Sequence, residues 1–195
     1  MLVKFHLESG DVLVNIITGN SLYNKIKRAC LGSPYSHVFL YMGELGLFST
    51  RAQRRIIRVP MIFESNGRGV TLRSLSSRYG EKVVVMRLKA EHDRRRIPRV
   101  LLEAIELASS FQSYYDYLVI VTFLIPWLIC QRLHIPIPLK YQRNALMICS
   151  EACAEIFWRA GVEIVPRDII PLPSSFVETD LLTKVREGVL GVDLL

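Results

Sequence analysis

Cys149 is the residue of this 195-residue sequence whose position best suits nucleophilic chemistry. It precedes a segment whose apolar residues repeat at helical spacing, which predicts a helix with one buried face. The partial positive charge of a helix N-terminus favours a thiolate, and the free backbone N–H groups there can stabilise an oxyanion. Alternatively, a cysteine at this position is a small buried hydrophobic side chain.

A thiol nucleophile needs a base with a pKa near neutral, and His37 lies at the beginning of a strand-like run after residues 33–36. Glu64 is an acidic residue inside an otherwise apolar run, where a buried carboxylate requires a positive or hydrogen-bonding partner. If the two strands are neighbours, Glu64 orients the imidazole and the three residues form a catalytic triad. Alternatively, His37 is structural and Glu64 lies on the solvent face of an edge strand.

The elements that must position these residues are short strands in the first half of the chain and helices in the second. Residues 10–14 are predicted to form a turn followed by a short strand, and further strands are predicted at 37–42, 61–65, 70–72 and 82–88. Helices are predicted at 19–31, 97–111 and 150–160. Leu101, Ile105 and Ala108 are expected to form the apolar face of the second helix. The pattern predicts a single α+β domain over residues 1–195 with a small, mainly antiparallel sheet.

An apolar insertion at about 117–140 interrupts this pattern. Its fourteen uncharged residues, 117–130, are too few to span a bilayer, which needs roughly 20, and Pro126 would kink a helix there. One interpretation is a buried core helix or the wall of an apolar pocket. The other is a segment at a membrane interface, with Trp127 near headgroup depth and basic residues following it.

The formal net charge of +7 suits an acidic partner. Two arginine clusters, at 51–58 and 94–99, contain no interleaved aromatic residues and belong to no nucleic-acid-binding motif, so no specific nucleic-acid partner is expected. They are interpreted as solvated basic faces or as a patch that rests on anionic lipid headgroups.

Four cysteines without regular close spacing predict free thiols and no disulfide framework: Cys30, Cys130, Cys149 and Cys153. Cys149 and Cys153 lie one helical turn apart, but no second ligand pair completes a metal-binding pattern, so no metal is expected. Charged residues near the start interrupt any apolar signal-peptide region. These features predict a cytoplasmic protein, with peripheral membrane contact as an additional hypothesis.

The order of the short motifs is informative in itself. Along the chain come Gly10-Asp11, Ser36-His37-Val38, Phe63-Glu64-Ser65, Tyr115-Asp116 and Cys149-Ser150-Glu151. This order resembles the permuted NlpC-type papain-like cysteine hydrolases, especially the YiiX/YebB-like branch and its relatives among poxvirus proteins and lecithin:retinol acyltransferase-like enzymes. The resemblance spans residues 10 to about 176. The insertion, which is long and apolar for this family, is the main departure.

The resemblance implies a papain-like fold with a central antiparallel sheet packed on the helix that starts at Cys149, in which the strand bearing the histidine precedes the cysteine. It assigns the roles of nucleophile, base and orienting acid to Cys149, His37 and Glu64. Tyr115 and Asp116 are expected to border the cleft and contact substrate; alternatively, they are structural. No cofactor is expected.

The functional hypothesis is a thiol-dependent hydrolase, either a peptidase or amidase or an acyltransferase. Its substrate would be a peptide or amide bond, or a lipid ester or thioester, and the apolar insertion and basic surface favour the lipid. The alternative is a non-catalytic module for membrane docking or protein binding on the same scaffold.

Overall fold

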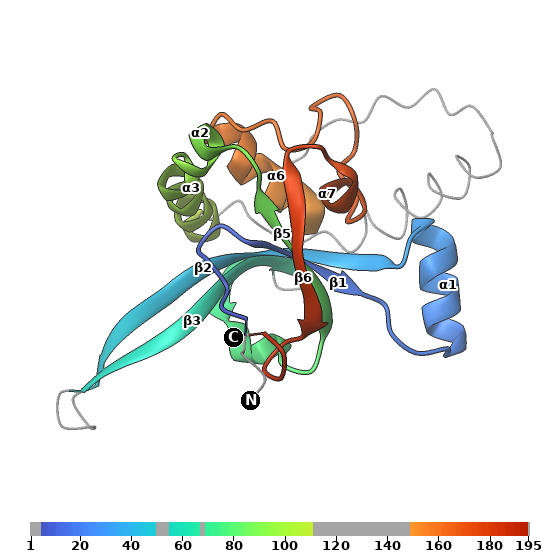
Figure 1. Ribbon diagram of the computed structural model, residues 1–195, viewed down its shortest axis with the longest axis horizontal. Coiled ribbons are helices and arrows are strands. Elements are labelled where there is room, and N and C mark those ends of the chain that lie inside the picture. Colours follow the sequence, from blue (N-terminus) through green and yellow to red (C-terminus); the bar gives the residue numbers. More distant parts are fainter. Residues whose placement is uncertain (1–4, 50–54, 67–68, 111–148, 195) are drawn as a thin grey trace.

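The computed structural model describes residues 5–49, 55–66, 69–110 and 149–194 (Figure 1). In chain order the elements are β1 (Val12–Ile16), α1 (Leu22–Leu31), β2 (Tyr35–Ser49), β3 (Arg55–Asn66), β4 (Gly69–Ser74), the 3-10 helix η1 (Leu75–Arg78), β5 (Lys82–Leu88), α2 (Glu91–Arg94), α3 (Ile97–Ser109), α6 (Cys149–Arg159), α7 (Ser175–Glu178) and β6 (Leu182–Val189). The fold is α+β, as predicted. None of the helices in these residues is long and apolar enough to cross a membrane.

The six strands form one sheet in the order β4-β3-β2-β1-β5-β6, and all five neighbouring pairs are antiparallel. The consecutive residues Val12, Leu13 and Val14 of β1 are all fully buried. A strand buried on both faces carries apolar residues continuously rather than in alternation, which accounts for this run and for the valines of β5. The sheet therefore has elements on both of its faces.

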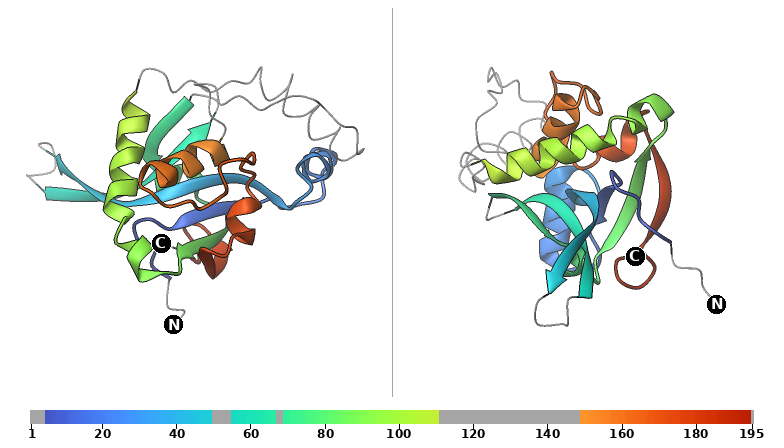
Figure 2. Two further views of the ribbon diagram at one scale, coloured as in Figure 1. Left: turned by 90° about the horizontal axis from the view of Figure 1, so that it is seen from above. Right: turned by 90° about the vertical axis from the view of Figure 1, so that its left-hand side faces the viewer.

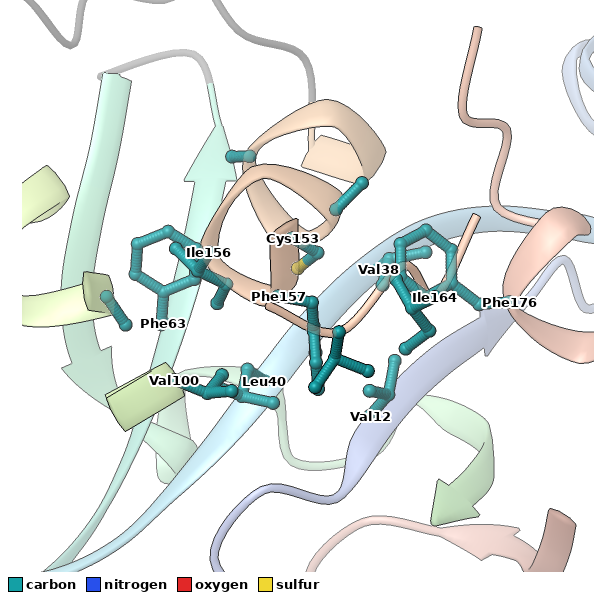
Figure 3. Close-up of a cluster of buried hydrophobic side chains, with 14 of the residues drawn as sticks. Val12, Val38, Leu40, Phe63, Val100, Cys153, Ile156, Phe157, Ile164 and Phe176 are labelled. Atoms are coloured by element: carbon teal, nitrogen blue, oxygen red, sulfur yellow. The ribbon is translucent and has the colours of Figure 1, made fainter. Parts of the chain in front are cut away.

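One face of the sheet packs on α3 and α6, which lie side by side over it (Figures 1 and 2). Figure 3 shows Cys153, Ile156 and Phe157 of α6 against Leu40 and Phe63 of the sheet. The opposite face carries a second cluster, formed by side chains from the N-terminal segment, the sheet, the 3-10 helix and the C-terminal segment: Leu7, Leu13, Phe39, Tyr41, Ile62, Leu75, Val83, Val85, Leu190 and Leu194.

Both ends of α6 are tied to the segment that follows the helix. The buried Ser150 hydroxyl donates to the carbonyl of Pro171 at 2.7 Å, and Trp158 Nε1 donates to the carbonyl of Val165 at 2.7 Å. Buried polar groups satisfied in this way fix the position of the helix on the sheet. Because Cys149 is the first residue of α6, these contacts also fix the position of its thiol.

The turn before β1 is held by Gly10 and Asp11. Gly10 has φ +93°, and a Cβ built there would lie 2.4 Å from Cδ1 of Ile97. The buried Asp11 carboxylate accepts from Arg87 Nε at 2.7 Å and from the backbone N–H of Glu8 at 2.8 Å. The Gly-Asp pair therefore has a structural role here, which joins β1 to β5.

Most predicted elements are confirmed, with shifts of one to three residues at their ends, and β2 and β3 extend well beyond the predicted 37–42 and 61–65. One expectation is wrong: β6 follows the helices, so the strands are not confined to the first half. The predicted inward stripe of α3 is confirmed in part. Leu101 and Ala108 pack against the core beside the buried Val100, Ala104 and Leu107. Ile105 is 45% exposed because its position on the helix lies beyond the edge of this buried arc. The insertion, with Tyr115 and Asp116, lies outside the described residues.

Candidate active site

The three residues predicted to form a triad come together from three elements. His37 lies near the beginning of β2, Glu64 near the end of β3, and Cys149 at the start of α6. The pairing of β2 with β3 begins at Phe39 and Glu64, and β3 continues beyond that point paired with β4. His37 and Val38 pair with β1 but precede the β2–β3 ladder, so the side of their backbone that faces away from β1 is open to the thiol of α6.

His37 and Glu64 are in direct contact. Nε2 of His37 lies 3.1 Å from Oε2 of Glu64, and the side chains are 17% and 0% exposed. The interpretation of Glu64 as a solvent-facing residue is therefore wrong. Its carboxylate is buried and paired, as the cost of desolvating a charge requires.

The thiol of Cys149 forms a hydrogen bond with the His37 side chain and accepts from the backbone N–H groups of Val38 and Ser150. Since Nε2 of His37 faces Glu64, Nδ1 is the ring nitrogen left for the thiol. The imidazole thus lies between sulfur and carboxylate, an arrangement that fixes its orientation through both nitrogens. Two backbone donors at the sulfur add stabilisation of negative charge.

The electrostatics favour a thiolate–imidazolium pair. Burial of Cys149 raises its pKa, but the His37 charge and hydrogen bonds outweigh burial, so the pKa is lowered from its ordinary value. Burial lowers the pKa of His37, while the Cys149 thiolate and Glu64 raise it more strongly, to about 9. Cys153, one turn along the same helix, has a pKa raised well above the ordinary value by burial and by the charge of Cys149. Of these two thiols, the surroundings favour the thiolate form only at Cys149.

Glu64 is held by more donors than the sequence indicated. Besides His37, its carboxylate accepts from Arg78 Nε at 3.0 Å, from Asn66 Nδ2 at 2.8 Å and from Arg73 Nη1 at 3.3 Å. Burial raises the pKa of Glu64, but the hydrogen bond from His37 and the charge of Arg78 lower it more, to about 2. The carboxylate is consequently ionised throughout the neutral range.

Arg78 belongs to the candidate site but was not indicated by the sequence. Its Nη2 lies 3.2 Å from Nε2 of His37, its Nη1 donates to Glu81 at 2.9 Å, and its guanidinium lies 5.7 Å from the centre of the Phe39 ring. Arg78 therefore contacts both the base and the orienting acid of the candidate triad. The only sequence signal was an arginine close to a glycine turn, which carries no specific information.

A network of hydrogen bonds behind Arg78 holds its guanidinium in place. Glu81 accepts from Asn15 Nδ2 at 2.6 Å, and Asn15 Oδ1 accepts from the Ser36 hydroxyl at 3.0 Å. Ser36 immediately precedes His37, so the network returns to the strand that carries the base. Connected polar networks of this kind restrict the side chains to one arrangement.

Some residues singled out in the sequence lie in the segment 111–148. Tyr115 and Asp116 lie outside the described residues, as does Cys130. Within the described ranges, no three His, Cys, Asp or Glu side chains converge in a way that could hold a metal ion.

Comparison with solved structures identifies the fold. The chain is similar to a crystal structure of the metalloprotein yiiX from Escherichia coli O157:H7, DUF1105, with a TM-score of 0.59, over 93% of this chain and 98% of that one. The identity is 15%, so the likeness shows a YiiX-like fold and nothing about activity. Neither the scan against protein-family models nor the search of curated proteins found a match.

Proposed function

We propose that the protein is a thiol-dependent hydrolase or acyltransferase of the permuted papain-like type, with Cys149 as nucleophile and His37 as base. One observation carries the proposal: a thiol, an imidazole and a buried carboxylate contact one another in sequence at the meeting point of α6, β2 and β3. Nucleophile, base and orienting group in this relation are typical of covalent catalysis. The histidine-bearing strand precedes the cysteine helix, as the permuted order requires.

In the first step, the thiolate sulfur of Cys149 attacks the carbonyl carbon of an amide, ester or thioester. A C–S bond forms, and the carbonyl oxygen takes up negative charge next to the N-terminus of α6, where backbone N–H groups favour an anion. The bond to the leaving nitrogen, oxygen or sulfur then breaks, and the His37 imidazolium gives its proton to that atom. A thioester on Cys149 results.

In the second step, neutral His37 accepts a proton from water or from an acceptor nucleophile, which attacks the thioester carbonyl. The C–S bond breaks, the acid or transferred acyl product leaves, and the thiolate and imidazolium are restored. Glu64 keeps the ring oriented and stabilises its positive charge throughout, without itself accepting the proton.

The similar crystal structure is described as that of a metalloprotein, so we considered whether this site suits a metal. The Glu64 carboxylate is already bonded to His37, Arg78, Arg73 and Asn66. A cation beside it would have to displace or face guanidinium groups. The described donor set therefore does not fit a metal, and no step of the proposed reaction uses one.

The proposal is tested by trapping the acyl-enzyme. Wild-type protein incubated with p-nitrophenyl acetate and with p-nitrophenyl decanoate is expected to release nitrophenol and to carry an acyl group on the peptide containing Cys149, detected by mass spectrometry. Cys149→Ala should abolish both signals. Cys153→Ala is the matched control, because that thiol lies one turn away on the same helix and should be unreactive.

Equal turnover by Cys149→Ala, or acylation spread equally over all cysteines, would exclude this chemistry at Cys149. Wild-type protein that neither releases nitrophenol nor carries an acyl group would favour the non-catalytic docking module on the same scaffold.

A further inference from the structure

The orientation of α1 is unusual for a helix of a globular protein. Its apolar side chains face solvent: Leu22 is 74% exposed, Tyr23 70% and Ile26 54%. At about 100° per residue these three lie on one arc of the helix. α1 also stands apart from α3 and α6, at the end of the sheet where β1 ends and β2 begins (Figures 1 and 2).

The polar side of α1 faces the body of the protein and is fastened to it. Asn24 Nδ2 donates to the carbonyl of Thr18 at 2.6 Å, and Arg28 Nη2 donates to the carbonyls of Ile17 at 2.7 Å and Gly19 at 3.0 Å. Ser21 caps the first turn by accepting from the backbone N–H of Asn24. These bonds hold the helix with its apolar arc outward.

The charges around the apolar arc all have one sign. Lys25 and Lys27 border it on its two sides, and Arg28 lies on the polar face. No Asp or Glu occurs anywhere in residues 12–43. An exposed apolar arc flanked by lysines, whose chains can extend their ammonium groups toward phosphates, has the composition of a helix that lies in a lipid interface.

We propose that the outward face of α1, formed by Leu22, Tyr23 and Ile26, docks on an anionic lipid surface. The apolar side chains insert at the level of the headgroups, and Lys25 and Lys27 pair with lipid phosphates. This inference goes beyond the proposed function and holds whether or not Cys149 is catalytic. The helix leads directly into β2, the strand that carries His37, with five residues between Leu31 and His37.

The test is co-sedimentation of the full chain with vesicles of phosphatidylcholine and phosphatidylglycerol at a ratio of 3:1, with pure phosphatidylcholine as reference. Wild-type protein should bind the anionic vesicles and lose affinity as salt rises from 0.1 to 0.5 M, because screening shortens the range of the lysine charges. The combined substitution Leu22→Gln, Tyr23→Gln and Ile26→Gln should weaken binding by at least about tenfold, because the inserted apolar area is removed.

A matched control is Leu102→Gln with Ile105→Gln, which removes exposed apolar side chains from α3 (42% and 45% exposed) and should leave vesicle binding unchanged. Lys25→Glu with Lys27→Glu, which leaves the apolar arc intact, should also weaken binding to the anionic vesicles. Circular dichroism verifies that each variant is folded.

Three results would overturn the proposal. The first is wild-type protein that does not bind anionic vesicles. The second is equal binding by the α1 variant and the wild type, which would assign the contact to another part of the chain. The third is wild-type protein that is dimeric and does not bind vesicles, together with an α1 variant that is monomeric. That result would make this face an interface between two copies.

Discussion

Substitution of Glu64 by glutamine should remove a pH-dependent contribution to folding that the buried carboxylate supplies. The pKa of Glu64 is lowered from 4.5 to about 2, which at 1.36 kcal/mol per pH unit corresponds to about 3 kcal/mol. Because its pKa is lower in the folded state, this stabilisation is fully present above about pH 4.5 and is lost as the pH falls toward about 2. The side chain is fully buried, so screening by water reduces the figure little.

The assay is urea unfolding, followed by tryptophan fluorescence, at a series of pH values between 2 and 7. The free energy of unfolding of the wild type should fall steeply between about pH 4.5 and 2. Glu64→Gln should be less stable at pH 7 by at least about 3 kcal/mol, since Arg78 and His37 also lose their buried partner. The unfolding free energies of the wild type and the variant should become similar as the pH approaches about 2.

Glu187 supplies the matched control. Its pKa is also lowered to about 2, first through the hydrogen bond from Lys184 and then through that from Lys82, but it lies at the surface of β6. Water screens such pairs, so Glu187→Gln should change the acid dependence by at most about 1 kcal/mol. If the Glu64→Gln curve runs parallel to the wild-type curve between pH 2 and 4.5, the reasoning about a buried ionised Glu64 is refuted.

Two further predictions concern Arg78 and Gly10. The charge of Arg78 lowers the pKa of both Glu64 and His37, so Arg78→Gln should raise both pKa values in an NMR titration. Arg78→Lys keeps the charge and should largely preserve them. Unchanged pKa values in the glutamine variant would contradict the assigned contacts. Gly10→Ala should lower the free energy of unfolding by about 2 kcal/mol more than Gly80→Ala in the same urea assay. Both positions have positive φ, but only Gly10 has a neighbouring side chain within reach of a new Cβ. Equal losses of unfolding free energy in the two variants would show that the side chain near Gly10 moves aside at no cost.

The extent to which the sequence predicted the structure follows from the range of the interactions. Local periodicity predicted β5 and α6 because consecutive residues carry the signal. The strand β6 was missed because Lys184, Arg186 and Glu187 make it resemble a solvated loop. As an edge strand it buries only one face, and charged residues are tolerated on the other.

The same distinction applies to the site. Glu64 was selected because a charge in an apolar strand needs a partner, and His37 and Cys149 because of their chemistry and order along the chain. Arg78 reaches the site from the 3-10 helix after β4, so its position depends on the pairing of β3 and β4. For α1, periodicity indicated which side chains share a face but not whether that face points inward. The membrane contact predicted for residues 117–130 stays a prediction, because they lie outside the described residues.

The central claim is that His37 activates Cys149, and the most direct measurement is the pH dependence of iodoacetamide labelling at each cysteine, read by peptide mass spectrometry. In wild-type protein, Cys149 should label below the ordinary cysteine pKa of about 8.5, while Cys153 on the same helix stays unlabelled. His37→Ala removes the imidazole without covering the thiol, so labelling of Cys149 should shift to higher pH. A Cys149 profile that resembles an ordinary thiol in the wild type and is unchanged in His37→Ala would contradict the account.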